Sequence, residues 1–222
     1  MRGDSIVVEP HHRSAAQGIL KLVGPSIRSS GSRYVITIAG ESGSGKSELA
    51  TAMAELLEEG DLACAILQQD DYFVYPPRSN DRARRDDISW VGPQEVHLDL
   101  MNQHLRAFLD GVDQIVKPLV IYDTDSIESE TLDFGGARVA VAEGTYTSLL
   151  ECINTRVFID RSYLDTRKHR QRRMRDQSEL DPFIDDVLAI EHGIISQHKD
   201  RANIIIHSDY SVMASAGQSL SP

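Results

Sequence analysis

One short motif constrains the fold of this chain more than any other feature. Residues 40–47 read G-E-S-G-S-G-K-S, which matches the pattern G-x-x-x-x-G-K-S. The apolar run at 35–39 predicts a buried parallel strand before the motif, and residues 48–57 have a helical pattern after it. In such a strand–loop–helix unit, backbone N–H groups and the helix N-terminus can surround a polyphosphate. The sequence therefore predicts a nucleoside triphosphate site in an α/β fold.

The residues of this loop have separate expected roles. Its glycines let the backbone adopt positive φ and approach a ligand closely. Lys46 is expected to reach the β- and γ-phosphates and to act in catalysis, and the Ser47 hydroxyl is expected to ligate Mg²⁺. The alternative is a glycine-rich turn that fits the pattern by chance, and the flanking strand and helix argue against it. The predicted ATP-binding segment consists of Gly40, Glu41, Ser42, Gly43, Ser44, Gly45, Lys46 and Ser47.

Two predicted strands carry carboxylates at their carboxyl ends, where open parallel sheets bind ligands. Residues 63–67 lead into Asp70 and Asp71, and the strand at 138–144 contains Glu143 near its end. Either aspartate could accept the proton of an attacking hydroxyl or hold Mg²⁺, and Glu143 could join the ligands of the metal. Helix capping is the alternative for all three acids, because carboxylates are favoured at helix N-termini.

A basic segment stands out in an otherwise acidic chain. Seven Lys or Arg residues fall within the fifteen positions 161–175, whereas the whole sequence has a net charge of −11. Arginine side chains on such a helix can stabilise the charge on a transferring phosphoryl group. A solvated basic surface is the alternative, and the concentration of charge in one place favours at least one functional arginine.

Hydrophobic periodicity and turn residues predict the other elements. Polar residues 76–87 predict a loop whose four arginines either close over an anion or pair with neighbouring aspartates. Trp90 either lines an acceptor pocket or packs, and His11 and His12 are expected in a solvated turn. Helices are expected at 14–27 (ending near Val23 because of Pro25), 94–109, 145–152 and 182–195, and strands at 6–8, 116–123, 155–160 and, as the last of the chain, 202–206.

Composition sets further expectations. A chain of 222 residues fits one α/β domain with additions. No apolar run approaches the roughly 20 residues of a membrane span, so we expect a cytoplasmic protein without a membrane partner. Cys64 and Cys152 are then reduced residues in or near the core. The acidic charge argues against nucleic-acid binding, and a homo-oligomer is left open.

The order of the motifs resembles the uridine kinase family, within the group of uridine kinases, phosphoribulokinases and nicotinamide riboside kinases. Over about residues 34–207 the chain reads phosphate loop, Q-D-D-Y-F, Y-D, A-E-G, D-T-R-x-x-R and K-x-x-A-x-I-I-I. The resemblance implies a three-layer P-loop NTPase fold with a mainly parallel, doubly wound sheet, helices on both faces and an arginine-rich lid. It also implies ATP and Mg²⁺ as cofactors, and phosphoryl transfer to the hydroxyl of a small molecule, a nucleoside such as uridine or cytidine.

The resemblance further implies roles for single residues. Asp70 matches the general base, contacts the acceptor and could touch Mg²⁺, and Glu143 matches the second acidic strand end of the family. The implied acceptor contacts are Tyr72, Tyr122 and Asp123, and the implied lid residues are Arg167 and Arg170 in catalysis and Arg175 in ATP binding. The implied domains are an N-terminal extension at 1–33 packed on the core, a P-loop kinase domain at 34–210 with its lid at about 161–182, and a flexible tail at 211–222.

Two departures from the family pattern bear on the acceptor. After Tyr122 and Asp123 the chain reads T-D-S-I-E-S, without the histidine that uridine kinases place there for the pyrimidine. The lid is also one residue longer than the usual spacing. Kinases for a sugar phosphate, glycerate, pantothenate or nicotinamide riboside are therefore alternatives, and a regulatory switch that binds ATP without a small acceptor is another.

Overall fold

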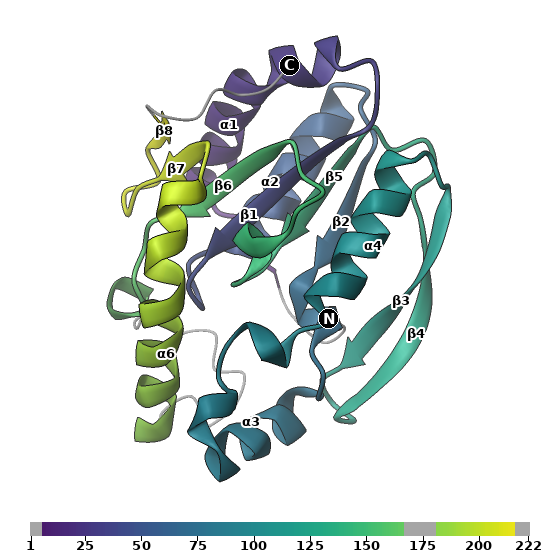
Figure 1. Cartoon of the computed structure of the whole chain (residues 1–222). Helices are drawn as coiled ribbons and strands as arrows, with labels where there is room; N and C mark the ends of the chain where they lie inside the picture. The colour runs from purple at the N-terminus through teal and green to yellow at the C-terminus, as the bar shows by residue number, and fades with distance from the viewer. Residues whose placement is uncertain (1–5, 167–180, 216–222) are drawn as a thin grey trace.

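A computed structural model describes residues 6–166 and 181–215, and these form three layers (Figure 1). The middle layer is a six-stranded sheet with the order β2-β5-β1-β6-β7-β8. All its strands are parallel except β8, which pairs antiparallel with β7. The strands are β1 (Tyr34–Gly40), β2 (Cys64–Gln68), β5 (Val139–Glu143), β6 (Thr155–Ile159), β7 (Ile204–Ile206) and β8 (Val212–Ala214). The predicted doubly wound, mainly parallel sheet is confirmed.

Both faces of the sheet are covered, which explains why its strands read as continuous apolar runs. Successive side chains of a strand point to opposite faces, so Ile36 of β1 contributes to one core and Val35 to the other. The first core includes α1 (Pro10–Ser29) and α2 (Lys46–Glu59). The second core includes α4 (Leu98–Leu109) and residues from the strands that follow it.

Two further strands, β3 (Gln114–Ile121) and β4 (Ser126–Asp133), form an antiparallel hairpin outside the main sheet (Figure 1). The turn of the hairpin docks on α3 (Pro77–Asp86). There Asp125 accepts a hydrogen bond of 2.7 Å from the backbone N–H of Arg78. The hairpin therefore satisfies one of the N–H groups that the first turn of a helix leaves unpaired.

The remaining elements connect these layers. Helix α6 (Pro182–Ile195) has the predicted bounds and begins at Asp181, whose side chain accepts from the N–H of Phe183. No helix in residues 6–166 and 181–215 is long and apolar enough to cross a membrane. The short 3₁₀ segments are η1 (Gln69–Tyr72), η2 (Ile88–Trp90), η3 (Pro93–Glu95), η4 (Thr147–Leu149) and η6 (Ser196–Arg201).

The N-terminal region corrects three predictions. Residues 10–29 form one helix, with no strand at 6–8 and no end near Val23. Pro25 is exposed, while Val23 and Ile27 on either side of it are buried in the core shared with α2. Packing therefore holds the last turns together although the proline removes one hydrogen bond. His12, expected in a solvated turn, is fully buried.

Four other segments also differ from the sequence prediction. Residues 77–86 are the helix α3 rather than a loop, and α4 starts at Leu98 rather than at 94. Residues 145–152 hold only η4, because the Thr147 hydroxyl donates to the backbone carbonyls of Ile38 and Gly144 and so competes with a helix. Residues 212–214 form β8, held by pairing with β7, where a flexible tail was predicted.

Candidate active site

The phosphate loop joins β1 to α2 at the carboxyl edge of the sheet. Gly45, at the start of α2, has the left-handed φ of 100° that favours glycine. Lys46 folds back over the loop, with its Nζ 2.9 Å from the carbonyl oxygen of Glu41. The strand, loop and helix are thus arranged as a polyphosphate site requires.

Glu143, at the end of β5, lies against this loop. The Ser47 hydroxyl donates a 3.0 Å hydrogen bond to its Oε1. Burial raises the pKa of Glu143 to about 7, and the negative charge of Asp70 adds to the rise, while the Lys46 charge and the Ser47 hydrogen bond oppose it. A buried carboxylate beside a second carboxylate and a hydroxyl is relieved by a bound cation, and its oxygen atoms suit Mg²⁺. The residues present therefore fit a magnesium ion.

Protein side chains alone would not complete such a site. Within the described residues, no three His, Cys, Asp or Glu side chains gather into a possible metal site. Magnesium sites in phosphate-binding proteins usually combine one or two carboxylates with phosphate oxygens and water.

The two adjacent acids after β2, Asp70 and Asp71, lie in different surroundings. Asp70 is half-buried at the sheet edge, where its charge acts on Glu143. Asp71 is buried, and its carboxylate accepts from Lys117 Nζ at 2.7 Å and from the N–H of Val120 at 3.1 Å. Of the two candidate bases, Asp70 is the one near Glu143 and the phosphate loop, whereas Asp71 anchors the hairpin.

The predicted acceptor contacts are also separated. Tyr72 is fully buried, with its hydroxyl 2.8 Å from His104 Nδ1. Its contact with the acceptor stays a prediction. Tyr122 is half-buried and Asp123 is exposed, and both lie in the turn between β3 and β4.

Glu41 ties the phosphate loop to the chain on both sides of residues 167–180. Its buried carboxylate accepts from the N–H of Tyr163 and lies 2.6 Å from Nδ1 of His192 in α6. The Thr166 hydroxyl donates to the carbonyl of Ser42 at 3.2 Å. The loop therefore contacts the first residues of the predicted lid and helix α6, which follows the lid. The predicted lid contacts Arg167, Arg170 and Arg175 lie outside the described residues.

Comparison with known proteins agrees with this geometry. The model of the phosphoribulokinase/uridine kinase family matches residues 35–205. The chain belongs to this family. It is therefore a P-loop kinase, as the order of its motifs predicted.

Several known kinases are similar to this family member. A bifunctional alpha-galactosidase/sucrose kinase of Mediterraneibacter gnavus is 32% identical over 192 residues, which are 81% of this chain and 20% of that protein. The chain thus spans only a fifth of the length of that relative. A uridine kinase of Ureaplasma urealyticum is 26% identical over 77% of this chain and 82% of its own. The D-glycerate 3-kinase of Cryptococcus neoformans shares the fold, with a TM-score of 0.62, 13% identity, and coverage of 93% of this chain and 100% of its own.

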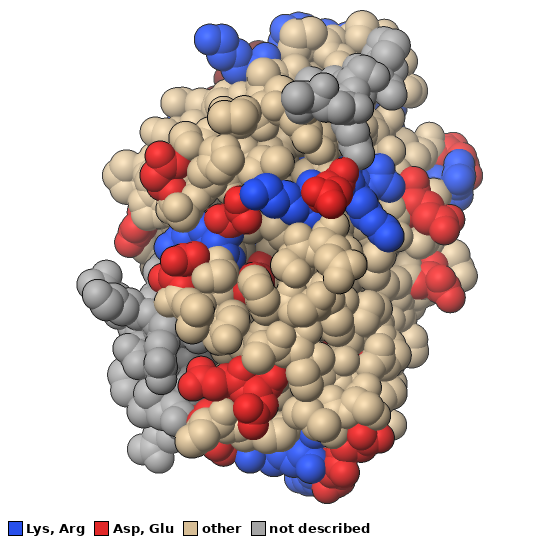
Figure 2. Space-filling view, turned by 60° about the vertical axis from the view of Figure 1, so that its left-hand side comes forward, with Lys and Arg blue, Asp and Glu red and all other residues tan. Residues whose placement is uncertain are grey.

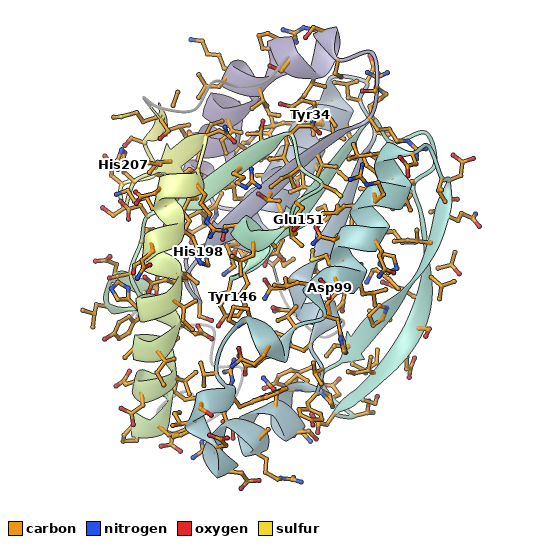
Figure 3. All side chains as sticks on the ribbon, in the orientation of Figure 1. Tyr34, Asp99, Tyr146, Glu151, His198 and His207 are labelled. Carbon is orange, nitrogen blue, oxygen red and sulfur yellow. The ribbon has the colours of Figure 1, made fainter. Side chains whose placement is uncertain are left out.

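The kinase fold also brings together charged residues that sequence reasoning did not assign. Arg84, which the sequence predicted in a loop, lies in α3 and forms ion pairs with Glu95 and with Glu191 of α6. Tyr146, just beyond β5, lies between the sheet edge and these elements (Figure 3), and the charges of all three act on it. Arg84 and Glu191 are 107 positions apart, so no local pattern could have paired them.

Two orphan atoms mark this cluster. In the part of the chain that is described, Glu191 Oε2 and Tyr146 Oη are buried without a hydrogen-bond partner. Burial raises the pKa of Glu191, with Arg84 opposing the rise, and the charges of Lys46 and Glu41 also reach it. The cluster therefore lies on the phosphate-loop side of the molecule.

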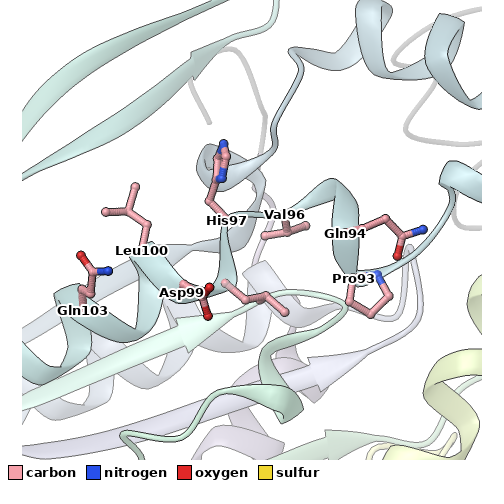
Figure 4. A pocket seen from close by; sticks show the side chains of 8 residues that line it. Pro93, Gln94, Val96, His97, Asp99, Leu100 and Gln103 are labelled. Atoms are coloured by element: carbon pink, nitrogen blue, oxygen red, sulfur yellow. The ribbon is translucent and has the colours of Figure 1, made fainter.

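A separate cavity of about 590 Å³ lies at the start of α4 and is lined by Pro93, Gln94, Val96, His97, Leu98, Asp99, Leu100 and Gln103 (Figure 4). None of the residues predicted for ATP, metal or acceptor lines it.

On the face drawn in Figure 2, Lys and Arg side chains lie beside Asp and Glu side chains rather than in one basic area. Trp90 packs, with its Nε1 donating to Asn80 Oδ1 at 2.9 Å.

Proposed function

We propose that this P-loop kinase transfers the γ-phosphoryl group of ATP, bound with Mg²⁺, to a hydroxyl of a small molecule. The observation that carries the proposal is the contact of Glu143 with Ser47 beside Asp70 at the phosphate loop. This arrangement supplies oxygen ligands for a cation and a carboxylate for the acceptor hydroxyl in one place.

Each of these residues would have a separate role in phosphoryl transfer. Asp70 takes the proton of the attacking hydroxyl, and Lys46 stabilises the charge that develops on the phosphoryl group. Ser47, Glu143 and Asp70 would hold Mg²⁺, which supplies charge neutralisation at the phosphates. Arg167, Arg170 and Arg175 are proposed to contact phosphates from the lid, and lid closure would exclude water as a competing acceptor.

The charge of the cluster around Arg84 supports a neutral acceptor. One guanidinium faces two carboxylates, Glu95 and Glu191, so an anionic acceptor such as a sugar phosphate or glycerate would meet net negative charge. Glu191 Oε2 can accept from a hydroxyl, and Tyr146 Oη can donate to or accept from one. A neutral compound with several hydroxyls would satisfy both orphan atoms.

Two neutral acceptors fit this description. The first is a nucleoside such as uridine or cytidine, as the motif order and the 26% identical uridine kinase suggest. The second is a sugar, which is favoured by the 32% identical relative whose name includes sucrose kinase. For a nucleoside acceptor, Tyr122 and Asp123 in the hairpin turn would contact it.

The test is ATP consumption with a panel of nucleosides, neutral sugars, sugar phosphates and hydroxy acids, together with the mass of the product. Stimulation by a neutral acceptor, with a product heavier by one phosphoryl group, is expected. Stimulation by anionic acceptors alone would refute the neutral acceptor, and tight ATP binding with no stimulation by any compound would favour a regulatory switch. Glu191→Gln should raise the KM for the acceptor more than the KM for ATP.

A further inference from the structure

Two segments outside the family match at residues 35–205 meet at the phosphate loop. Tyr210 lies in the turn between β7 and β8, which begins at His207 (Figure 3). Its Oη is 3.3 Å from the carbonyl oxygen of Ser44. His12, in the first turn of α1, has its Nε2 3.2 Å from the same Oη. Both side chains pack closely against the loop, because a Cβ added to Gly45 would lie 2.8 Å from Tyr210 Oη and 3.1 Å from His12 Nε2.

The contacts of His12 and Tyr210 indicate which of their atoms donate and which accept. The N–H of Glu9 donates to Nδ1 of His12 at 3.1 Å, so Nδ1 carries no proton and the neutral ring is protonated at Nε2. His12 Nε2–H then faces two acceptors at 3.2 Å, Tyr210 Oη and Nε2 of His11, and Tyr210 Oη also accepts from the Arg161 guanidinium. The Tyr210 hydroxyl donates its own proton to the carbonyl oxygen of Ser44.

Tyr210 is held firmly in this position. Its backbone φ of 64° lies in the left-handed region, which a residue with a large side chain adopts only when its surroundings compensate. The Arg161 guanidinium lies over its ring at 4.9 Å, and the ring of His11 lies 4.1 Å from it. These contacts fix the phenol as a rigid support for the loop.

We propose that His12 and Tyr210 are positioning residues of the ATP site. Through the Ser44 carbonyl and the close packing on Gly45, they hold the loop in the conformation in which its N–H groups surround the phosphates. A loop that is already ordered binds a ligand more tightly, because less conformational entropy is lost on binding. The inference rests on the proposed binding of MgATP, and it gives the N-terminal helix a function in the kinase core.

A matched pair of variants at His12 tests the proposal, with MgATP binding to the full chain measured by calorimetry. In His12→Asn the side-chain oxygen can replace Nδ1 as the acceptor for Glu9 but does not reach Tyr210. In His12→Gln the side-chain amide can replace Nε2–H as the donor to Tyr210. We expect His12→Asn to weaken MgATP binding about fivefold to tenfold, the effect of one lost hydrogen bond, and His12→Gln to bind within about twofold of wild type.

Tyr210→Phe removes a single oxygen atom and keeps the test decisive if a His12 variant folds poorly. It should weaken MgATP binding as much as His12→Asn, and combining the two should add little, because both break the same chain of hydrogen bonds. Additive losses, equal losses in His12→Asn and His12→Gln, or unchanged binding in Tyr210→Phe would each overturn the inference. A wild-type chain that does not bind MgATP would instead refute the proposed function.

Discussion

Lys117 and Asp71 form a buried ion pair whose loss should destabilise the protein strongly. Lys117 Nζ lies 2.7 Å from Asp71 Oδ2, and the two side chains are only 4% and 3% exposed. Lys117→Met keeps most of the apolar stem but removes the cation that faces both the buried Asp71 carboxylate and, at 2.7 Å, Oε1 of Glu130. Breaking one side of a buried pair lowers the free energy of unfolding by about 3–5 kcal/mol, which is a large part of the stability of a typical domain.

The pair between Arg13 and Glu59 is the matched control. Its N–O distance is also 2.7 Å, but its side chains are 37% and 59% exposed. Arg13→Gln should therefore leave the free energy of unfolding almost unchanged, because water solvates and screens both charges. Burial, not distance, decides the difference between the two pairs.

Urea unfolding measures this difference, followed by the fluorescence of Trp90, the single tryptophan of the chain, and by circular dichroism. Adding Asp71→Asn to Lys117→Met should restore more than half of the lost stability, because the amide still accepts from Val120 and carries no charge. The reasoning is refuted if Lys117→Met and Arg13→Gln have the same small effect, or if Asp71→Asn restores nothing.

Three further outcomes are expected. Asp70→Asn should lower turnover about 10²- to 10⁴-fold with MgATP affinity nearly unchanged, measured with the acceptor found in the panel; unchanged turnover would remove Asp70 as the base. Gly144→Ala should lower the melting temperature, because its Cβ would lie 2.2 Å from Gln69 Cβ; an unchanged melting curve would contradict that contact. Burial lowers the pKa of His104, and the Lys117 charge lowers it further. As pH falls below about 6.5, the unfolded chain therefore binds more protons than the folded chain, and the free energy of unfolding declines. His104→Gln should flatten this decline in urea titrations at several pH values, and a decline as steep as that of the wild type would exclude His104 as its source.

Local sequence was sufficient wherever conformation depends on neighbours within a few positions. The phosphate loop, the apolar strands beside it and the bounds of α6 were all predicted, because strand runs, glycines and helix caps act over short distances. Motif order was also sufficient for the family, which the match at residues 35–205 confirms.

Local patterns failed where distant partners hold an element. α3 is polar on every side and shows no apolar period, yet Asp125 caps it and Arg84 anchors it to Glu95 and Glu191. β8 exists because β7 offers it backbone partners. These elements depend on tertiary contacts, so their own residues predicted a loop and a tail.

The sequence by itself determined that a P-loop kinase core would form and that carboxylates would stand at its strand ends. Only the tertiary structure decided which carboxylate lies near Glu143 and the phosphate loop, because Asp70 and Asp71 are neighbours with the same chemistry and only their surroundings differ. It also decided that His12 supports the loop, through a contact with Tyr210 that spans 198 positions. A side chain's type is set by the sequence, whereas its burial and its partners are set by the packing of elements far apart in the chain.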